Sequence, residues 1–134
     1  MTSVQLRVER TGALLAVRAA VARTWRERIV GLLSRRGLPE GEAMVFPACR
    51  SIHTAGMRFS IDVLFVDRDP STSPPSAWSL GELHWRVVAL RPHVLPWRLV
   101  GPVWSAWGAI ELPAGTLAQH GVQAGDRLTA APNP

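Results

Sequence analysis

Three side chains that could bind a soft metal lie four residues apart within the stretch CRSIHTAGMRFSIDVLFVD (residues 49–67): Cys49, His53 and Met57. Thiolate, imidazole and thioether suit copper, and electron-transfer copper sites combine these ligand types. Such sites also need a second histidine, usually upstream, whereas the other three all lie downstream: His84, His93 and His120. We therefore expect no metal or other cofactor, with Cys49 as a small buried side chain, His53 hydrogen-bonded at a strand end and Met57 in the core.

The same cysteine and histidine could instead form a nucleophile and base pair, because a nearby imidazole raises the thiolate fraction. On a strand, Cys49 and His53 would share a face but sit about 13 Å apart at roughly 3.3 Å per residue. That separation is too long for proton transfer. The pattern therefore favours a binding or accessory module over a thiol enzyme, and it leaves the question of enzymatic activity open.

A third group combines arginines with carboxylates in otherwise apolar segments: Arg28, Arg35, Asp62 and Glu111. The two arginines are seven residues apart, which places them on nearly the same face of a helix. Buried carboxylates are rarely left unpaired, so we expect a structural network of ion pairs that docks this helix on a sheet. The functional alternative is a pocket for an anionic small ligand or protein partner, since guanidinium binds carboxylate and phosphate bidentately. Its expected lining is Arg28, Arg35, His53, Thr54, Met57 and Asp62.

Arginine and tryptophan are the last candidate set. The net charge of +5 comes from fifteen arginines and no lysine, and eight of the arginines precede residue 39. Among the six tryptophans, Trp85–Arg86 and Trp97–Arg98 could stack on bases or sugar rings. An Arg/Trp surface for nucleic acid is therefore the alternative function. The other four tryptophans are Trp25, Trp78, Trp104 and Trp107.

Length and composition indicate one domain over residues 1–134. A single cysteine cannot form an internal disulfide, and no apolar stretch approaches the roughly 18 residues of a membrane span. The apolar run ALLAV (residues 13–17) is shorter than the roughly 7 residues that a signal peptide requires, so we expect a cytoplasmic protein.

One helix and many short strands must position these residues. Residues 25–36 are predicted as the prominent α-helix, because Thr24 and Glu27 form a capping box and Pro39 prevents continuation. A helical turn capped by Thr116 is expected over residues 116–121, and residues 70–79 read as a loop insertion. Strands are expected at 13–22, 43–46, 50–54, 61–66, 83–90, 109–112 and 126–130. The fold class is mainly β: a β-sandwich or a jelly-roll-like barrel.

Five motifs in order resemble the family called domain of unknown function 192. They are R-x-x-G-L-L-x-R (28–35), SIHTAGMRFSIDVLFVD (51–67), LRPHVLPWR (90–98), ELPAGT (111–116) and GVQAGDRL (121–128). The resemblance covers about residues 13–130. It implies a mainly β domain of sandwich or jelly-roll type with one prominent helix, and no established activity. Residues 52–57 (IHTAGM) depart from the run common in the family, and the loop at 70–79 is longer than usual.

Overall fold

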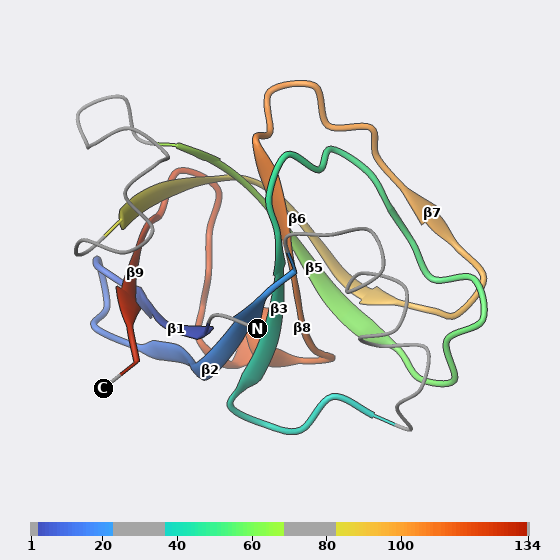
Figure 1. Cartoon of the computed structure of the whole chain (residues 1–134), viewed down its shortest axis with the longest axis horizontal. Helices are drawn as coiled ribbons and strands as arrows, with labels where there is room; N and C mark the ends of the chain where they lie inside the picture. The colour runs from blue at the N-terminus through green and yellow to red at the C-terminus, as the bar shows by residue number, and fades with distance from the viewer. Residues whose placement is uncertain (1–2, 23–36, 69–82, 134) are drawn as a thin grey trace.

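The computed structural model describes residues 3–22, 37–68 and 83–133 (Figure 1). Seven strands form its main body: β1 (Ser3–Val8), β2 (Leu14–Val21), β3 (Glu42–Phe46), β5 (Ile61–Arg68), β6 (Leu83–Val94), β8 (Gly108–Pro113) and β9 (Arg127–Pro132). Two short strands, β4 (Ile52–His53) and β7 (Leu99–Val100), form a separate pair, and one short helix follows β8: α2 (Thr116–Gln119).

The seven longer strands close into a barrel in the order β1-β2-β3-β8-β5-β6-β9, with β9 hydrogen-bonded back to β1. All neighbours pair antiparallel except β2 and β3, which run parallel. The mainly β prediction is therefore confirmed, and the described strands enclose one core instead of packing as two separate sheets. Within the described residues, no helix is long and apolar enough to cross a membrane.

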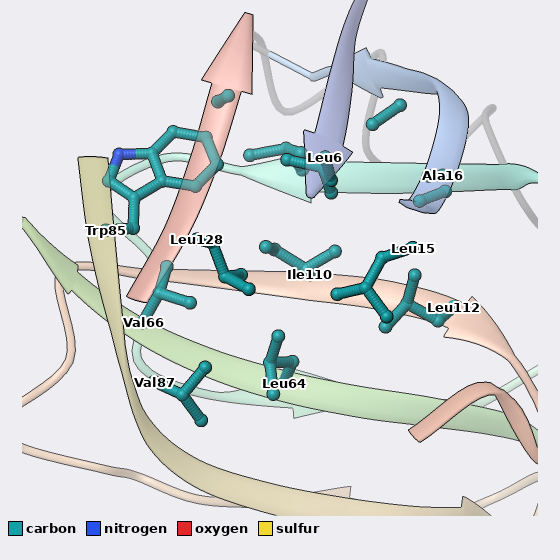
Figure 2. Close-up of a cluster of buried hydrophobic side chains, with 14 of the residues drawn as sticks. Leu6, Leu15, Ala16, Leu64, Val66, Trp85, Val87, Ile110, Leu112 and Leu128 are labelled. Atoms are coloured by element: carbon teal, nitrogen blue, oxygen red, sulfur yellow. The ribbon is translucent and has the colours of Figure 1, made fainter. Parts of the chain in front are cut away.

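The inside of the barrel is filled by alternate side chains of the strands (Figure 2). On β5, Leu64 and Val66 point inward, and on β8 Ile110 and Leu112 do the same. Trp85, 2% exposed, closes this core beside Leu128 (Figure 2). Trp85 is therefore a core residue, and its ring is not exposed for stacking on bases or sugar rings.

A second apolar cluster covers the outer face of β3, β8 and β5. It is formed by the side chains that point away from the barrel interior, including Met44, Val63 and Phe65. Residues 47–60 and 95–107, which we call the lobe, contribute Ile52, Met57 and Ala106 to the same cluster. Figure 1 shows β7, in orange, beside the barrel on its right-hand side.

Most predicted strands are confirmed, with ends shifted by a few residues. The strand expected at 50–54 is reduced to β4, and β1 and β7 were not predicted. The prominent helix at 25–36 and the loop insertion at 70–79 fall outside the described residues and stay predictions. The helical turn at 116 is confirmed as α2, but its capping residue differs, as described below.

Candidate functional site: the tryptophan loop

The carboxylate of Asp62 links two backbone segments by hydrogen bonds. Its Oδ1 accepts a hydrogen bond from the amide of His93 at 2.9 Å, and its Oδ2 accepts one from the amide of Leu117 at 2.9 Å. The side chain is fully buried. Leu117 is the second residue of α2, so Asp62 supplies the N-terminal cap of that helix from another part of the chain.

The predicted cap by Thr116 is therefore wrong. Gly115 occupies the N-cap position and has no side chain to accept, while Thr116 is the first helical residue. The Thr116 hydroxyl instead donates to the carbonyl oxygen of Pro113 at 2.7 Å. The prediction assumed that the capping oxygen comes from a residue next to the helix, whereas it comes from Asp62 on β5.

The predicted ligand-binding residues are distributed over different environments. Arg28 and Arg35 lie outside the described residues, so their ion pairs with Asp62 and Glu111 stay predictions. Met57 is buried in the outer cluster, whereas Asp62 lies on the inner face of β5 together with Leu64 and Val66. Thr54 is fully buried and His53 is exposed. Ligand binding by this set of residues stays a prediction.

Glu111 is the one strongly perturbed acid in the described part of the chain. It is buried on β8, where it pairs in register with Met44 of β3 and Val63 of β5, and its Oε2 has no hydrogen-bond partner among the described residues. Burial without compensation raises the pKa of Glu111 to about 8. The folded protein therefore holds this side chain as a neutral acid at pH 7.

Cys49 forms local contacts in the lobe. Its thiol donates to the carbonyl oxygen of Ser51 at 3.0 Å, and its amide donates to the carbonyl oxygen of Trp107 at 3.0 Å. No three His, Cys, Asp or Glu side chains in the described ranges come together as a metal site. Since β4 includes only Ile52 and His53, the extended strand assumed between Cys49 and His53 is not formed.

Thr54 also organises the loop at residues 95–99 (LPWRL), which we call the tryptophan loop. The Thr54 hydroxyl donates to the carbonyl oxygen of Leu95 at 2.7 Å and accepts from the amide of Arg98 at 2.8 Å. The Thr54 amide donates to the carbonyl oxygen of Arg98 at 2.8 Å, and the Thr54 carbonyl oxygen accepts from the amide of Trp97 at 3.1 Å. One buried threonine thus holds three of the five loop residues.

The loop ends in the β4–β7 pair, which fixes its position within the lobe against residues 52–53. His53 pairs with Leu99, and Ile52 pairs with Val100. Beyond β7, the amide of Val103 donates to the carbonyl oxygen of Arg50 at 2.9 Å. A Cβ added at Gly101 would lie 2.6 Å from that same oxygen, so only glycine permits this close approach.

The tryptophan loop is the most apolar exposed part of the described chain. Trp97 is 70% exposed, Leu99 69% and Leu95 52%. Trp104, also in the lobe, is 76% exposed, and among described residues only one other large apolar side chain, Val17, is exposed to a similar degree. Three of these exposed side chains come from one stretch of five residues: Leu95, Trp97 and Leu99.

Positive charge without negative charge surrounds this loop. The lobe contains Arg50, Arg58 and Arg98, which are all exposed, and no aspartate or glutamate. Within the described residues, none of the three guanidinium groups forms an ion pair; Arg50 Nε donates to the carbonyl oxygen of Ala106, and Arg98 Nη1 to that of Trp97. The surface is therefore suited to an anionic partner.

The sequence reading identified Trp97 and Arg98 but not the leucines or the role of Thr54. LPWRL holds three large apolar residues within five, in a region without acids, and that combination is the signal that was missed. Trp107 differs from Trp97 because it packs on Trp85, with ring centroids 5.8 Å apart, and under the guanidinium of Arg68 at 5.4 Å.

A second surface feature is a shallow hollow of about 300 Å³ between the end of β6 and α2. It is lined by Leu90, Pro92, Leu117, Ala118, Gly121, Val122 and Gln123. Its lining includes no ionisable side chain, so it offers no group for acid, base or anion chemistry.

Two solved structures are similar to this chain along most of its length. A "putative transcription regulator" from Sinorhizobium meliloti superposes with a TM-score of 0.72 at 20% identity, covering 96% of this chain and 92% of its own. A protein of unknown function from Novosphingobium aromaticivorans gives a TM-score of 0.69 at 21% identity, covering 94% and 82%. At these identities the similarity establishes a shared fold.

No curated protein matches the chain. The model of one family, described as "Uncharacterized ACR", matches residues 6–72, which is half of the 134 residues. The matched range includes SIHTAGMRFSIDVLFVD and the Thr54 that holds the tryptophan loop, while the later motifs lie beyond it. The chain therefore belongs to the domain of unknown function 192 family.

Proposed function

We propose that this protein is a binding module that takes an anionic partner through the tryptophan loop and the arginines of the lobe. The observation that carries the proposal is the backbone of Trp97. This residue has a φ of +61°, in the left-handed region that non-glycine residues avoid, and its side chain is nevertheless 70% exposed. An L-residue in that conformation costs about 1–2 kcal/mol.

The surrounding contacts hold this conformation in place. The amide of Trp97 donates to the carbonyl oxygen of Thr54, and the residues on both sides of the turn are bound by the Thr54 hydroxyl. Strained backbone persists where the structure over-determines it, and it is concentrated at binding and catalytic sites. A buried core gains nothing from an exposed indole, so the strain is best explained by display of the ring to a partner.

The charge pattern supports a negatively charged partner. Three exposed arginines without an internal carboxylate partner, in a lobe without acids, create a positive local potential. The guanidinium group binds carboxylate, phosphate and sulfate in a planar, bidentate manner. An anion at this surface would neutralise charges that the protein itself leaves uncompensated.

The test compares two double variants with the same change in net charge on a polyanion probe, heparin-agarose. Arg50→Gln with Arg98→Gln removes lobe charge, and Arg18→Gln with Arg86→Gln removes exposed arginines from the barrel strands β2 and β6. We expect the lobe variant to elute at clearly lower salt than the barrel variant. Equal elution of the two variants would show that retention reflects net charge alone and would refute the proposal.

Nucleic acid is the second candidate partner, and the exposed Trp97–Arg98 dipeptide favours it because both side chains can stack on bases. The structural neighbour from Sinorhizobium meliloti is described as a transcription regulator. Binding of single-stranded oligo(dT) should then fall steeply with salt, and Trp97→Ala should weaken it about tenfold. Oligo(dT) affinity that is the same at low and moderate salt would exclude this candidate.

A further inference from the structure

We propose that the anionic partner is a lipid bilayer and that the tryptophan loop is its interfacial anchor. This inference rests on the proposed function and names the chemical class of the partner. It starts from the two exposed leucines, Leu95 and Leu99, which neither small anions nor nucleic acids would bury usefully.

The composition of the loop matches the boundary between headgroups and acyl chains. Indole prefers this boundary because one part of the ring is apolar while its N–H needs a polar partner. Leucine side chains gain free energy from entering the hydrocarbon side. Arginine places its guanidinium among the phosphates while its methylene stem lies deeper. Leu95, Trp97, Arg98 and Leu99 provide all three types within five residues.

The geometry allows these side chains to act together. The Cα atoms of Leu95 and Leu99 can be at most about 14 Å apart, because four residue steps span no more than roughly 3.5 Å each. All three apolar side chains are at least half exposed. Shallow insertion of an apolar edge to a depth of roughly 5–10 Å requires only such a compact tip.

Charge selects the kind of bilayer. Each arginine close to a surface of anionic lipid adds to binding, and the three lobe arginines have no carboxylate nearby in the described structure that would offset them. Nucleic acid would also attract these arginines. It would, however, leave Leu95 and Leu99 in water, and the exposed leucines therefore favour the bilayer.

The anchor is also ordered before it binds. Thr54 fixes the carbonyl of Leu95 and the amides of Trp97 and Arg98, and the β4–β7 pair fixes Leu99. Ordering a loop on binding normally reduces affinity. Here the loop backbone is already held in the unbound protein, so burial of the three apolar side chains is not offset by the cost of ordering that backbone.

The experiment measures sedimentation with vesicles of phosphatidylcholine alone and of phosphatidylcholine mixed with phosphatidylserine. The full chain should sediment with the mixed vesicles and much less with the neutral ones. Leu95→Ser with Leu99→Ser should lower the partition coefficient about tenfold or more. Val17→Ser is the matched control, because Val17 is similarly exposed but lies on β2 of the barrel, and it should sediment like the original protein.

A second measurement does not depend on the folding of the leucine variant. Vesicles with brominated acyl chains quench an indole that enters the hydrocarbon boundary. They should quench the original protein more than the conservative variant Trp97→Phe, in which the ring remains apolar but the loop loses its fluorophore. Equal quenching of the two proteins would overturn the assignment of Trp97 to the anchor.

The outcomes separate this inference from the proposed function. Loss of vesicle binding in the leucine variant, with unchanged elution from heparin, supports a lipid anchor. Heparin retention that depends on Arg50 and Arg98, without binding to mixed vesicles, overturns the bilayer and keeps an anionic partner. Binding of oligo(dT) but not of vesicles identifies nucleic acid instead. If heparin does not distinguish the lobe variant from the barrel variant and vesicles are not bound, both proposals fail.

Discussion

The two regions that differ most in this molecule are the lobe and the end of the barrel formed by β1, β6 and β9. At that barrel end, opposite charges are paired. Arg10 binds the Asp126 carboxylate through Nε at 2.7 Å and through Nη2 at 3.1 Å. Glu9 Oε1 lies 2.7 Å from His84 Nδ1 and accepts from the hydroxyl of Thr129 at 2.9 Å.

The lobe has the opposite arrangement. Its three arginines are exposed and its sequence has no acid, so its positive charge is not compensated by its own residues. Four of its large apolar side chains, Leu95, Trp97, Leu99 and Trp104, are also exposed, whereas most apolar side chains of the barrel strands are buried. The comparison shows that the charges at this barrel end are paired internally, while the arginines of the lobe and the rings of Trp97 and Trp104 are exposed.

Two buried carboxyl groups in different parts of the barrel also differ in their protonation. The hydrogen bond from Arg10 lowers the pKa of Asp126, which keeps that side chain ionised. Glu111, on the sheet face beneath the second apolar cluster, has its pKa raised to about 8 by burial. One carboxyl thus favours folding as an anion and the other as a neutral acid.

The largest expected effect is the pH dependence caused by Glu111. Between about pH 4.5 and 8, the unfolded chain releases this proton while the folded chain retains it, so stability decreases as pH rises. The slope is about 1.4 kcal/mol per pH unit, or about 5 kcal/mol at most over that window. Glu111→Gln should remove this slope in urea unfolding measured at several pH values.

The control for this prediction is Glu40→Gln, which removes a carboxyl at an exposed position. It should leave the slope in place. A Glu111→Gln variant whose stability declines with pH as steeply as that of the original protein would contradict the assignment of the buried proton to Glu111.

The next effect breaks the close contact within the lobe between Gly101, which follows β7, and Arg50. Gly101→Ala places a Cβ 2.6 Å from the carbonyl oxygen of Arg50 at a φ of +94°, and it should destabilise the protein by about 3 kcal/mol. Gly12→Ala is matched, because Gly12 has a φ of +73° and open space around it, and should cost about 1 kcal/mol. Thermal unfolding of both variants gives the difference; equal losses would mean that the close approach has no energetic weight.

A threonine-to-valine substitution can be compared between the two regions, at Thr54 in the lobe and at Thr129 at the paired barrel end. Thr54→Val removes the donor to Leu95 and the acceptor for Arg98, so we expect a loss of about 2 kcal/mol and weaker heparin retention. Thr129→Val removes one partly exposed hydrogen bond to Glu9 and should cost less than about 1 kcal/mol. Chemical denaturation measures the free energy of unfolding of both variants. A Thr54 variant as stable as the Thr129 variant would refute the claim that Thr54 holds the tryptophan loop in place.

The smallest effect is at the paired end. Arg10→Gln removes the hydrogen bond that lowers the pKa of Asp126, and the stability from this pair is present above pH 4 and lost as pH falls through the lowered pKa. The variant should therefore be slightly less stable than the original protein at neutral pH and equal to it in strong acid. A difference that persists unchanged into acid would exclude the ion pair as its cause.

Local patterns in the sequence predicted the barrel strands well. The strand expected at 61–66 (IDVLFV) is β5, where Asp62, Leu64 and Val66 share one face and Ile61 and Val63 the other. Period-two alternation is a property of neighbouring residues, and it can therefore be read without knowing the rest of the fold.

The functions of the polar residues were not predictable in this way because their partners are distant in the chain. Asp62 was expected to pair with helix arginines, but its described contacts are the amides of His93 and Leu117, 31 and 55 residues away. Thr54 looked like a ligand residue, whereas its hydroxyl serves backbone groups 41 and 44 residues downstream. Only the closed barrel brings these atoms together.

The carboxylate of Asp62 accepts two backbone hydrogen bonds, and this has a consequence for the order of folding. A helix of four residues has no stability by itself, since helix nucleation is unfavourable. The carboxylate that caps α2 reaches its position only when β5 has paired with β6, because its other oxygen binds the amide of His93 at the end of β6. We therefore expect α2 to form after these strands have paired, so that mutations in α2 accelerate unfolding and leave the folding rate nearly unchanged.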